Sequence, residues 1–296
     1  MANLKEVRNR IVSVSSTQQI TNAMKMVSAA KLRRATDAII QLRPYANKLK
    51  EILANLSASV EGNASPFLEN RVPNKVLVVI VTSNRGLAGA FNMNAIKTVN
   101  KLVSTKYNEQ FQKGNISIIA IGKKGHDYYQ KHEYNVVGNN NELFNNLNFE
   151  NVSVLTQSIM DSFVKGDYDR VELVYNEFRS ASVQALTTEQ LLPLEPTVAI
   201  ENAGGGSAET DYIFEPSIEE IIAELIPKSI KTQLYKAVLD SYASEHGARM
   251  IAMDKATDNA GELIKELKLA YNQARQAAIT TELTEIVSGA AALSNG

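Results

Sequence analysis

The C-terminal stretch of the chain constrains the fold most, because residues 228–293 contain no proline and carry apolar side chains at helical intervals. Alternating steps of three and four residues are typical of the a/d seam of a left-handed coiled coil. A helix of this length extends roughly 100 Å, so we expect it to project from a compact domain, to pair with another helix, or both. The seam comprises Met253, Ala256, Ala260, Leu263, Leu267, Ala270, Ala274 and Ala277, and a second register, shifted by two residues, comprises Ile279, Leu283, Ile286, Ala290 and Leu293.

A second long helix is predicted near the N-terminus, from about residue 3 to about residue 57. Pro44 lies inside it, and since proline in a helix interior costs ~3 kcal/mol, we expect a bend there unless packing holds the helix continuous. Two such helices at opposite ends of one chain pair most simply as an antiparallel coiled coil. The apolar positions are Leu4, Val7, Ile11, Val14, Ile20, Met24 and Val27, followed by Leu32, Ala35, Ile39, Leu42, Ala46, Leu49, Leu53 and Leu56.

Between the helices, residues 75–195 alternate between strand-like and helix-like segments, which predicts a small α/β domain. Residues 75–82 and 116–121 are β-branched runs typical of strands buried on both faces of a parallel sheet. A third strand is predicted at 171–175, short strands at 136–138 and 183–186 (the latter antiparallel at the edge), and helices at 92–105 and 152–164.

The segment 196–216 is predicted to be a linker and a foot segment, because it contains the run Gly204, Gly205, Gly206 and Ser207. Ser217 and Glu220 form a possible capping box at the start of the next helix. Pro227 is expected to end or kink that short helix before the long one begins. The predicted organisation is therefore residues 1–57, 75–195, 196–216 and 217–296.

The charge distribution is uneven although the total is −1. Residues 1–50 hold ten Lys or Arg against Glu6 and Asp37, a surplus of eight positive charges that the remainder balances. Such a surface fits a solvated face, a nucleic acid or an acidic protein partner, and the scarcity of aromatic side chains argues against nucleic acid. The absence of cysteine excludes disulfides and thiolate chemistry. We expect an unprocessed cytoplasmic chain, since the N-terminus lacks a secretory apolar region.

Several groups could suggest chemistry, but a structural role explains each of them better. The loops 83–89 and 122–125 follow strands, yet both lack the glycine patterns of phosphate-binding loops. His126 and His132 are six residues apart, whereas helical metal-ligand pairs are four apart, so they and His246 are expected to be surface residues. The acidic row on the C-terminal helix suggests a solvated face or a complement to the basic first helix: Asp254, Asp258, Glu262 and Glu266.

Four segments resemble the gamma subunit, or central stalk, of the rotary ATP synthase. They are residues 17–27 (TQQITNAMKMV), residues 83–87 (SNRGL), residues 248–259 (ARMIAMDKATDN) and residues 279–290 (ITTELTEIVSGA). The similarity extends over the whole chain in order. It implies an antiparallel left-handed coiled coil of the N- and C-terminal helices with a central Rossmann-like α/β domain at the foot.

The resemblance also implies a role and a set of partners. The coiled coil would turn inside a ring of alpha and beta subunits, with the catalytic sites in the beta subunits, so this chain is expected to be non-catalytic and to need no cofactor or metal. Other implied partners are the epsilon subunit and the membrane c-subunit ring, with one copy of the chain per complex and no nucleic acid. The implied contacts are Arg275, Gln276 and Thr280 with catch loops of the beta subunits, Met24, Lys25 and Arg249 with their acidic lever segments, and Tyr212, Phe214 and Glu215 at the foot.

Two rival functions remain open from the residues alone. A nucleotide-binding enzyme with helical arms would bind nucleotide directly in its α/β domain, and a coiled-coil scaffold would dimerise through its seams. The resemblance favours a bacterial rotor shaft, peripheral at the cytoplasmic face of the inner membrane.

The C-terminal helix is expected to extend beyond its partner. If residue 56 lies near residue 230 and both helices rise equally per residue, Leu4 comes level with roughly residue 282. The segment 286–296 carries no charged side chain and is expected to sit in an apolar sleeve of the ring as a bearing.

Overall fold

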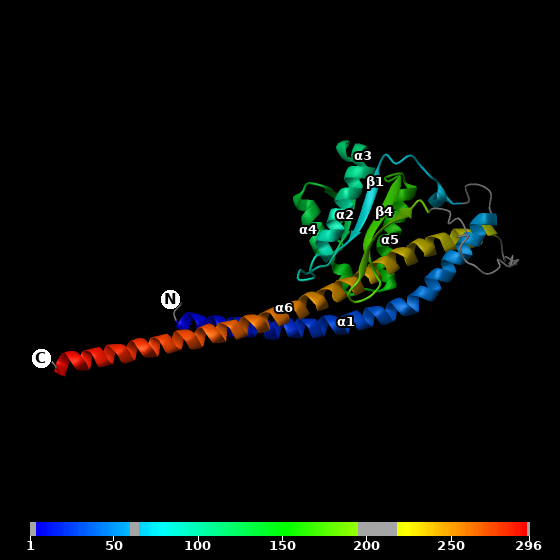
Figure 1. Cartoon of the computed structure of the whole chain (residues 1–296). Helices are drawn as coiled ribbons and strands as arrows, with labels where there is room; N and C mark the ends of the chain where they lie inside the picture. Colours follow the sequence, from blue (N-terminus) through cyan, green and yellow to red (C-terminus); the bar gives the residue numbers. More distant parts are fainter. Residues whose placement is uncertain (1–3, 60–64, 195–217, 295–296) are drawn as a thin grey trace. The chain divides into compact units, whose positions relative to one another are not determined.

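The computed structural model describes residues 4–59, 65–194 and 218–294, which form a long helix, a sheet with its helices, and a second long helix. The chain divides into two compact units, one of residues 1–29 and 249–296 and the other of residues 30–248. The long helices are α1 (Leu4–Ser59) and α6 (Ile218–Ser294) (Figure 1). Each unit thus contains one segment of each long helix.

In the first unit, the segments of α1 and α6 run antiparallel. Lys25 of α1 bonds to Asp254 of α6, and Thr21, one turn nearer the N-terminus, bonds to Thr257. The amide of Gln18 reaches the carbonyl oxygen of Thr257 as well. Residue numbers therefore fall along α1 as they rise along α6, which confirms the predicted antiparallel coiled coil.

The predicted seam of α1 is wrong at two positions. Ile20 is 60% exposed and Val27 is 58% exposed, while Thr21 and Ser28 are buried. The reason is that one heptad repeat runs through the region without interruption, and polar side chains fill it where apolar ones were expected. Its two rows, all buried or half-buried, are Val7, Val14, Thr21, Ser28 and Ala35, and Leu4, Ile11, Gln18, Lys25, Leu32 and Ile39.

The predicted seam of α6 is correct from Met253 to Leu267 and then changes face. Ala270 and Ala277 are exposed, whereas Tyr271, Ala274 and Ala278 are half-buried. The predicted continuation from Ile279 to Leu293 is not a seam within the described chain, because the helix is exposed at 279–291. The predicted level of Leu4 is also wrong: Lys25 lies opposite Asp254, and equal rise along both helices places Leu4 beside about residue 275.

The second unit is built on a five-stranded sheet in the order β3-β2-β1-β4-β5. β1 pairs in parallel with β2 and β4, β2 pairs in parallel with β3, and β5 pairs antiparallel with β4 at the edge. The parallel order and the antiparallel edge are both as predicted. The bounds are β1 (Val76–Val81), β2 (Ile116–Ile121), β3 (Asn135–Val136), β4 (Arg170–Phe178) and β5 (Gln184–Leu192), with helices α2 (Phe91–Lys106), α3 (Asn108–Gln112), α4 (Lys123–Lys131) and α5 (Phe149–Val164) and the short 3-10 turns η1 (Pro66–Leu68) and η2 (Asn141–Asn145).

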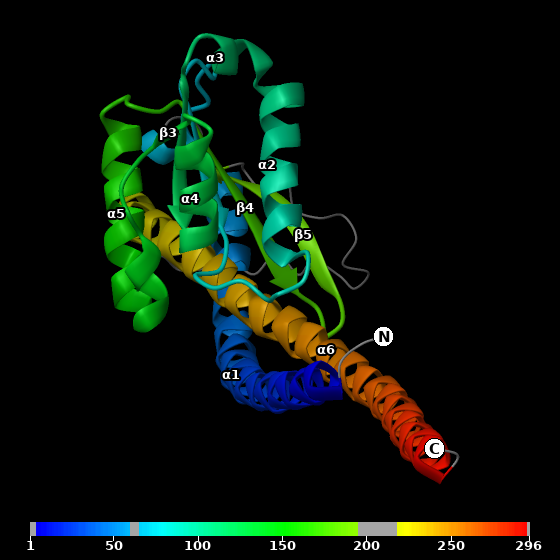
Figure 2. The same cartoon turned by 90° about the vertical axis from the view of Figure 1, so that its left-hand side faces the viewer.

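Both faces of the sheet are covered, which explains the continuous apolar runs of β1 and β2. On one face, Leu77, Val79 and Val81 pack with α5 and with the first part of α6. On the other face, Val76, Val78 and Ile80 pack with α2 and with Tyr129 of α4 (Figure 2). Strand alternation therefore directs the side chains of one strand into two separate cores.

Neither proline ends its helix. α1 continues through Pro44, and α6 is a single helix of 77 residues through Pro227, so of the two outcomes predicted at Pro227, an end or a kink, the end is wrong. The reason lies in the flanking residues Ile222, Ile226 and Ile230, which are all buried in the core below the sheet. Burying each contributes about 1.5–3 kcal/mol, which together exceeds the ~3 kcal/mol that a proline costs in a helix interior.

Smaller differences concern the loops. β3 begins one residue before the predicted segment and is only two residues long, and η2 forms inside the asparagine-rich loop 139–148. β4 and β5 are longer than predicted, since their antiparallel pairing extends to Phe178 on β4 and to Leu192 on β5. The linker 196–216 and the proposed cap Ser217 lie outside the described residues.

Candidate functional site

Two strand-to-helix loops of the sheet, 83–89 and 122–125, are the candidates for binding a phosphate, and the amides of the second are bonded within the chain. At the start of α4, the backbone N–H groups of Lys123, Lys124 and Gly125 donate to Asn84 Oδ1 (2.9 Å), the Ser83 carbonyl (3.1 Å) and Thr82 Oγ1 (2.9 Å). A helix N-terminus binds an anion through amides that lack a partner in the chain. The geometry at α4 therefore supports a structural role for this loop.

The glycines of the second loop also have structural reasons. Gly122 has φ +108°, and a Cβ there would lie 2.1 Å from the carbonyl oxygen of Thr82. A Cβ on Gly125 would lie 2.8 Å from Thr82 Oγ1. Both glycines are needed because α4 begins directly against the end of β1, with no ligand involved.

The histidines are separate from one another. His132 stacks on Tyr128, with 4.1 Å between ring centroids, and His126 lies 3.9 Å from its neighbour Asp127. His246 was expected at the surface, but it is buried with its ring edge-on to Tyr242, so that expectation is wrong. Within residues 4–59, 65–194 and 218–294, no group of three or more His, Asp or Glu side chains could hold a metal ion.

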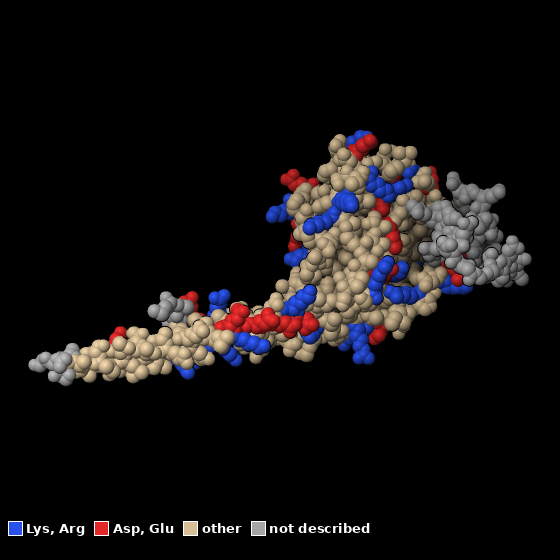
Figure 3. All heavy atoms as spheres, in the orientation of Figure 1, with Lys and Arg blue, Asp and Glu red and all other residues tan. Residues whose placement is uncertain are grey.

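The six described partner-contact candidates all lie in the first unit. Among them, Lys25 forms an ion pair with Asp254 at 2.5 Å. The hydrogen bond and the charge of Asp254 raise the pKa of Lys25, and Asp258 adds to this. The acidic row of α6 is thus a partial complement to the basic first helix, and Figure 3 shows acidic side chains gathered along the paired helices. The charge of Lys25 is offset inside the chain before any partner binds.

Met24 and Arg249 are less accessible than a simple contact role requires. Met24 is half-buried, and its carbonyl oxygen accepts a hydrogen bond from Ser28 Oγ (2.8 Å). Arg249 is only 7% exposed. A buried or half-buried side chain of this kind is suited to holding the helix surface around it in position.

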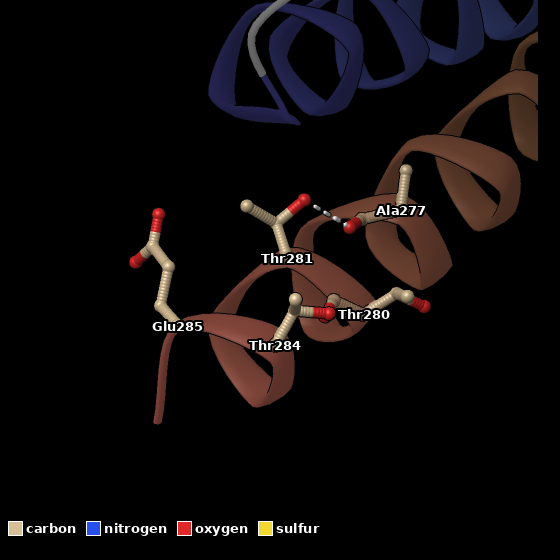
Figure 4. A pocket seen from close by; sticks show the side chains of 5 residues that line it. All are labelled: Ala277, Thr280, Thr281, Thr284 and Glu285. Atoms are coloured by element: carbon tan, nitrogen blue, oxygen red, sulfur yellow. Dashed lines mark hydrogen bonds between the residues drawn. The ribbon is translucent and has the colours of Figure 1, made fainter. Parts of the chain in front are cut away.

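Arg275, Gln276 and Thr280 lie on the exposed end of α6. Thr280 Oγ1 donates to the carbonyl oxygen of Gln276 at 2.9 Å, and Thr284 Oγ1 donates to the carbonyl oxygen of Thr280 at 2.8 Å. Such bonds within the helix leave the threonine methyl groups facing outward. Figure 4 shows an open hollow beside Thr280 and Thr284. The residues that line it all come from α6: Ala277, Thr280, Thr281, Thr284 and Glu285.

The remaining candidates, Tyr212, Phe214 and Glu215, lie outside the described residues. The residues that sequence reasoning missed are those of the polar seam, which we define as Gln18, Thr21, Ser28 and Thr257. The signal that could have found them is the spacing of seven that links Val7, Val14, Thr21 and Ser28. Among the described helices, none is both long and apolar enough to cross a membrane.

The fold and this surface define a class of protein: two very long helices that pair antiparallel, joined through an α/β domain, with candidate contacts on the helices. The sequence matches the family described as ATP synthase over residues 3–293. It is 56% identical over 294 residues to the ATP synthase gamma chain of Flavobacterium johnsoniae, covering 99% of each chain. It is also 53% identical over 296 residues to that of Cytophaga hutchinsonii, covering 100% of each. The chain belongs to the ATP synthase gamma-chain family.

Solved structures share the fold. The rotor of the mitochondrial ATP synthase of Euglena gracilis in rotational state 1 contains a chain with a TM-score of 0.65 and 21% sequence identity, and the match covers 93% of this chain and 98% of that one. A second structure from the same organism, in rotational state 3, gives a TM-score of 0.66 at 20% identity, covering 98% and 94%. The long helices and the mixed sheet are therefore a conserved architecture at low identity.

Proposed function

We propose that this chain is the central rotor shaft of a proton-translocating ATP synthase. It couples rotation of the membrane c-subunit ring to ATP synthesis or hydrolysis at catalytic sites in the beta subunits. The observation that carries the proposal is that α6 continues past the end of α1 as a single exposed helix, from about residue 275 onward. A lone helix with this much apolar surface requires a surrounding partner, and a ring of alpha and beta subunits supplies one.

The chain itself is non-catalytic in this proposal. Two observations support it: the amides at the start of α4 are bonded within the chain, and the described histidines do not converge on one point. The α/β domain then serves as the foot of the shaft. Its foot residues Tyr212, Phe214 and Glu215 contact the c-subunit ring and the epsilon subunit, and the chain is peripheral at the cytoplasmic face of a bacterial inner membrane.

The residues of the shaft divide into two groups. Arg275, Gln276 and Thr280, all exposed, make direct contacts with catch loops of the beta subunits. Lys25 presents a cation that is already partly balanced by Asp254, so its contribution to an acidic lever segment is modest. Met24 and Arg249 hold the shape of the same surface from inside.

The decisive experiment mixes the purified chain with alpha and beta subunits. A single copy should enter each ring and stimulate ATP hydrolysis. Direct nucleotide binding by the chain alone would support the rival enzyme, and dimerisation without binding to alpha and beta subunits would support the rival scaffold. The matched control is the chain carrying Arg275→Ala and Gln276→Ala, which should assemble but stimulate hydrolysis less.

A further inference from the structure

Among the described residues of the second unit, one carboxylate is buried without a hydrogen-bond partner. Asp240 of α6 is 0% exposed, and neither of its side-chain oxygens accepts a hydrogen bond from the described residues. Of the helix positions around it, Ala237, Val238 and Ala243 are buried and apolar, whereas Ser241 and Ser244 are buried and polar. An ionised carboxylate in such a place costs several kcal/mol unless it is paired and hydrogen-bonded.

Three donors on the elements around Asp240 are bonded to other acceptors. The Tyr175 hydroxyl of β4 donates to Glu189 Oε1 of β5 at 2.9 Å, and the Gln233 amide of α6 points to Glu189 Oε2 at 3.4 Å. The guanidinium of Arg43 in α1 donates to the carbonyl oxygen of Phe178 at 3.1 Å. These three donors are thus committed to acceptors other than Asp240.

The charges around Asp240 oppose one another. Lys236 on its own helix and Arg43 on α1 favour its ionised form, and Glu177 on β4 and Glu189 on β5 disfavour it by less. Burial is the largest influence and raises the pKa of Asp240 to about 6. Burial therefore favours a bound proton, against the net effect of these charges, at a pH where an exposed aspartate has lost it.

We propose that Asp240 is a proton-binding site that controls how firmly α6 is held against β4 and β5. The protonated carboxyl is neutral and packs among its apolar neighbours. On losing the proton it becomes a buried anion whose hydrogen-bonding needs are met only if α6 and the strands separate slightly. This inference concerns the second unit alone and does not depend on the proposed rotor function.

The sign of the pH effect follows from linkage. The folded chain binds the proton more tightly than the unfolded chain, so stability falls as pH rises through the interval between the two pKa values and levels off above the folded one. The deprotonated carboxylate is therefore a destabilising feature at neutral pH. With a folded pKa of about 6 and an ordinary unfolded value, the effect on the unfolding equilibrium between pH 5 and pH 7.5 is about tenfold.

The test compares the full-length chain with Asp240→Asn, which is close in shape and always neutral. Unfolding is measured at several pH values from 5 to 7.5, and the ratio of the two unfolding constants is taken at each pH. We expect the unfolding constant of the wild-type chain to rise about tenfold relative to that of Asp240→Asn across this range. Asp258→Asn, which removes an exposed carboxylate from the same helix, is the control and should show a much flatter ratio. A pH-independent ratio for Asp240→Asn would overturn the proposal.

A second measurement needs no variant and covers the case in which Asp240→Asn fails to fold. Hydrogen exchange of the wild-type chain, corrected for the intrinsic pH dependence of the exchange rate, is compared at pH 5 and pH 7.5. Peptides from β4, β5 and residues 233–246 of α6 should lose protection at the higher pH relative to peptides from α2. Equal protection at both pH values in these segments would contradict the proposal.

Discussion

The hydroxyl groups of Thr21 and Thr257 lie 2.8 Å apart across the seam between α1 and α6. Both belong to seam positions where an apolar side chain would be the ordinary choice. Each hydroxyl also has an acceptor on its own helix, the carbonyl oxygen of Gln18 for Thr21 Oγ1 (3.0 Å) and that of Met253 for Thr257 Oγ1 (2.8 Å). Near them, a Cβ on Gly261 would lie 3.0 Å from the amide nitrogen of the Gln18 side chain, which reaches across to α6. The polar seam thus combines close approach with a specific pairing of residues.

The first prediction concerns this pair. Replacing Thr21 with valine keeps the shape and removes the hydroxyl that bonds to Thr257 and to the Gln18 carbonyl oxygen, so the free energy of unfolding should fall by about 0.5–1.5 kcal/mol. The double variant Thr21→Val and Thr257→Val should recover most of that loss, because an apolar pair suits a seam. A double-mutant cycle from denaturant unfolding gives the coupling energy. Additive effects of the two substitutions would mean that the hydroxyl pair contributes nothing specific.

The polar seam also shows what could be predicted from sequence and what could not. The antiparallel pairing, the buried strands β1 and β2 and the antiparallel edge were predictable, because apolar periodicity reports directly on burial. Ile20 and Val27 were placed in the seam because they are apolar, whereas the seam contains Thr21 and Ser28, which continue the spacing of seven from Val7 and Val14. That spacing identifies the positions, but the residue that lies opposite each of them, such as Thr257 opposite Thr21, is known only from the structure.

The candidate site was less predictable than the fold. Arg275, Gln276 and Thr280 were suggested only by resemblance, Thr280 as part of the segment 279–290 and the other two from just before it. Their exposure on α6 is consistent with contact to a partner, but no feature of spacing or charge selects them. Asp240 was not singled out at all, although an aspartate among Ala237, Val238 and Ala243 on a core-facing helix is a detectable signal. Its significance depends on Glu177 and Glu189, which come close only through the fold.

The second prediction concerns a buried acid in the other core. Glu172 of β4 is 2% exposed and accepts hydrogen bonds from Lys106 Nζ at 2.7 Å and from the Tyr107 hydroxyl. Lys106→Met should destabilise the second unit by roughly 1–3 kcal/mol, less than for a fully buried pair because Lys106 is partly exposed. Lys101→Met, which changes an exposed lysine on the same helix, is the control. The melting temperatures of the two variants should differ clearly. Equal melting temperatures would show that the hydrogen bond from Tyr107 alone is sufficient to stabilise the Glu172 carboxylate.

The third prediction uses two glycines of positive φ. Gly122→Ala should destabilise the second unit strongly, because its Cβ would lie 2.1 Å from the Thr82 carbonyl oxygen, so β1 and α4 would have to separate. Gly114→Ala should cost only about 1 kcal/mol, since φ is +72° but no atom lies within 4 Å of the added carbon. The denaturant concentration at the midpoint of unfolding measures the loss of stability in each of the two variants. Similar losses in the two variants would show that backbone strain, and not the contact with Thr82, makes Gly122 necessary.

The fourth prediction separates two effects of the basic first helix. Lys31→Glu with Arg33→Glu changes two exposed residues, so the fold should remain intact while coupled ATP synthesis and its salt dependence fall. Lys25→Glu should additionally destabilise the helix pair, because it places a third carboxylate beside Asp254 and Asp258. Thermal unfolding of the isolated chain and ATP synthesis by reconstituted complexes are measured for each variant. Unchanged coupling in the Lys31 and Arg33 variant would refute an electrostatic role for this surface.

The fifth prediction concerns the end of α6, where the helix has no neighbour in the described chain. The segment from Ile286 to Gly296 carries no charged side chain, and Ile286, Val287 and Leu293 are each more than 60% exposed. Burial in an apolar sleeve would stabilise this segment, yet the hydrophobic effect is non-directional and so resists rotation weakly. We therefore expect the segment to act as a bearing, with torque passed nearer Arg275 and Gln276.

Deleting residues 286–296 tests this role directly. The truncated chain should form complexes that dissociate more readily, since the apolar contact with the ring is lost, while the assembled complexes still rotate and hydrolyse ATP. Truncation at residue 275 is the matched comparison, because it also removes Gln276 and Thr280 and should abolish torque. Subunit dissociation and single-molecule rotation are measured on the same preparations. Complexes lacking only residues 286–296 that stay intact but do not rotate would show that this segment itself transmits torque.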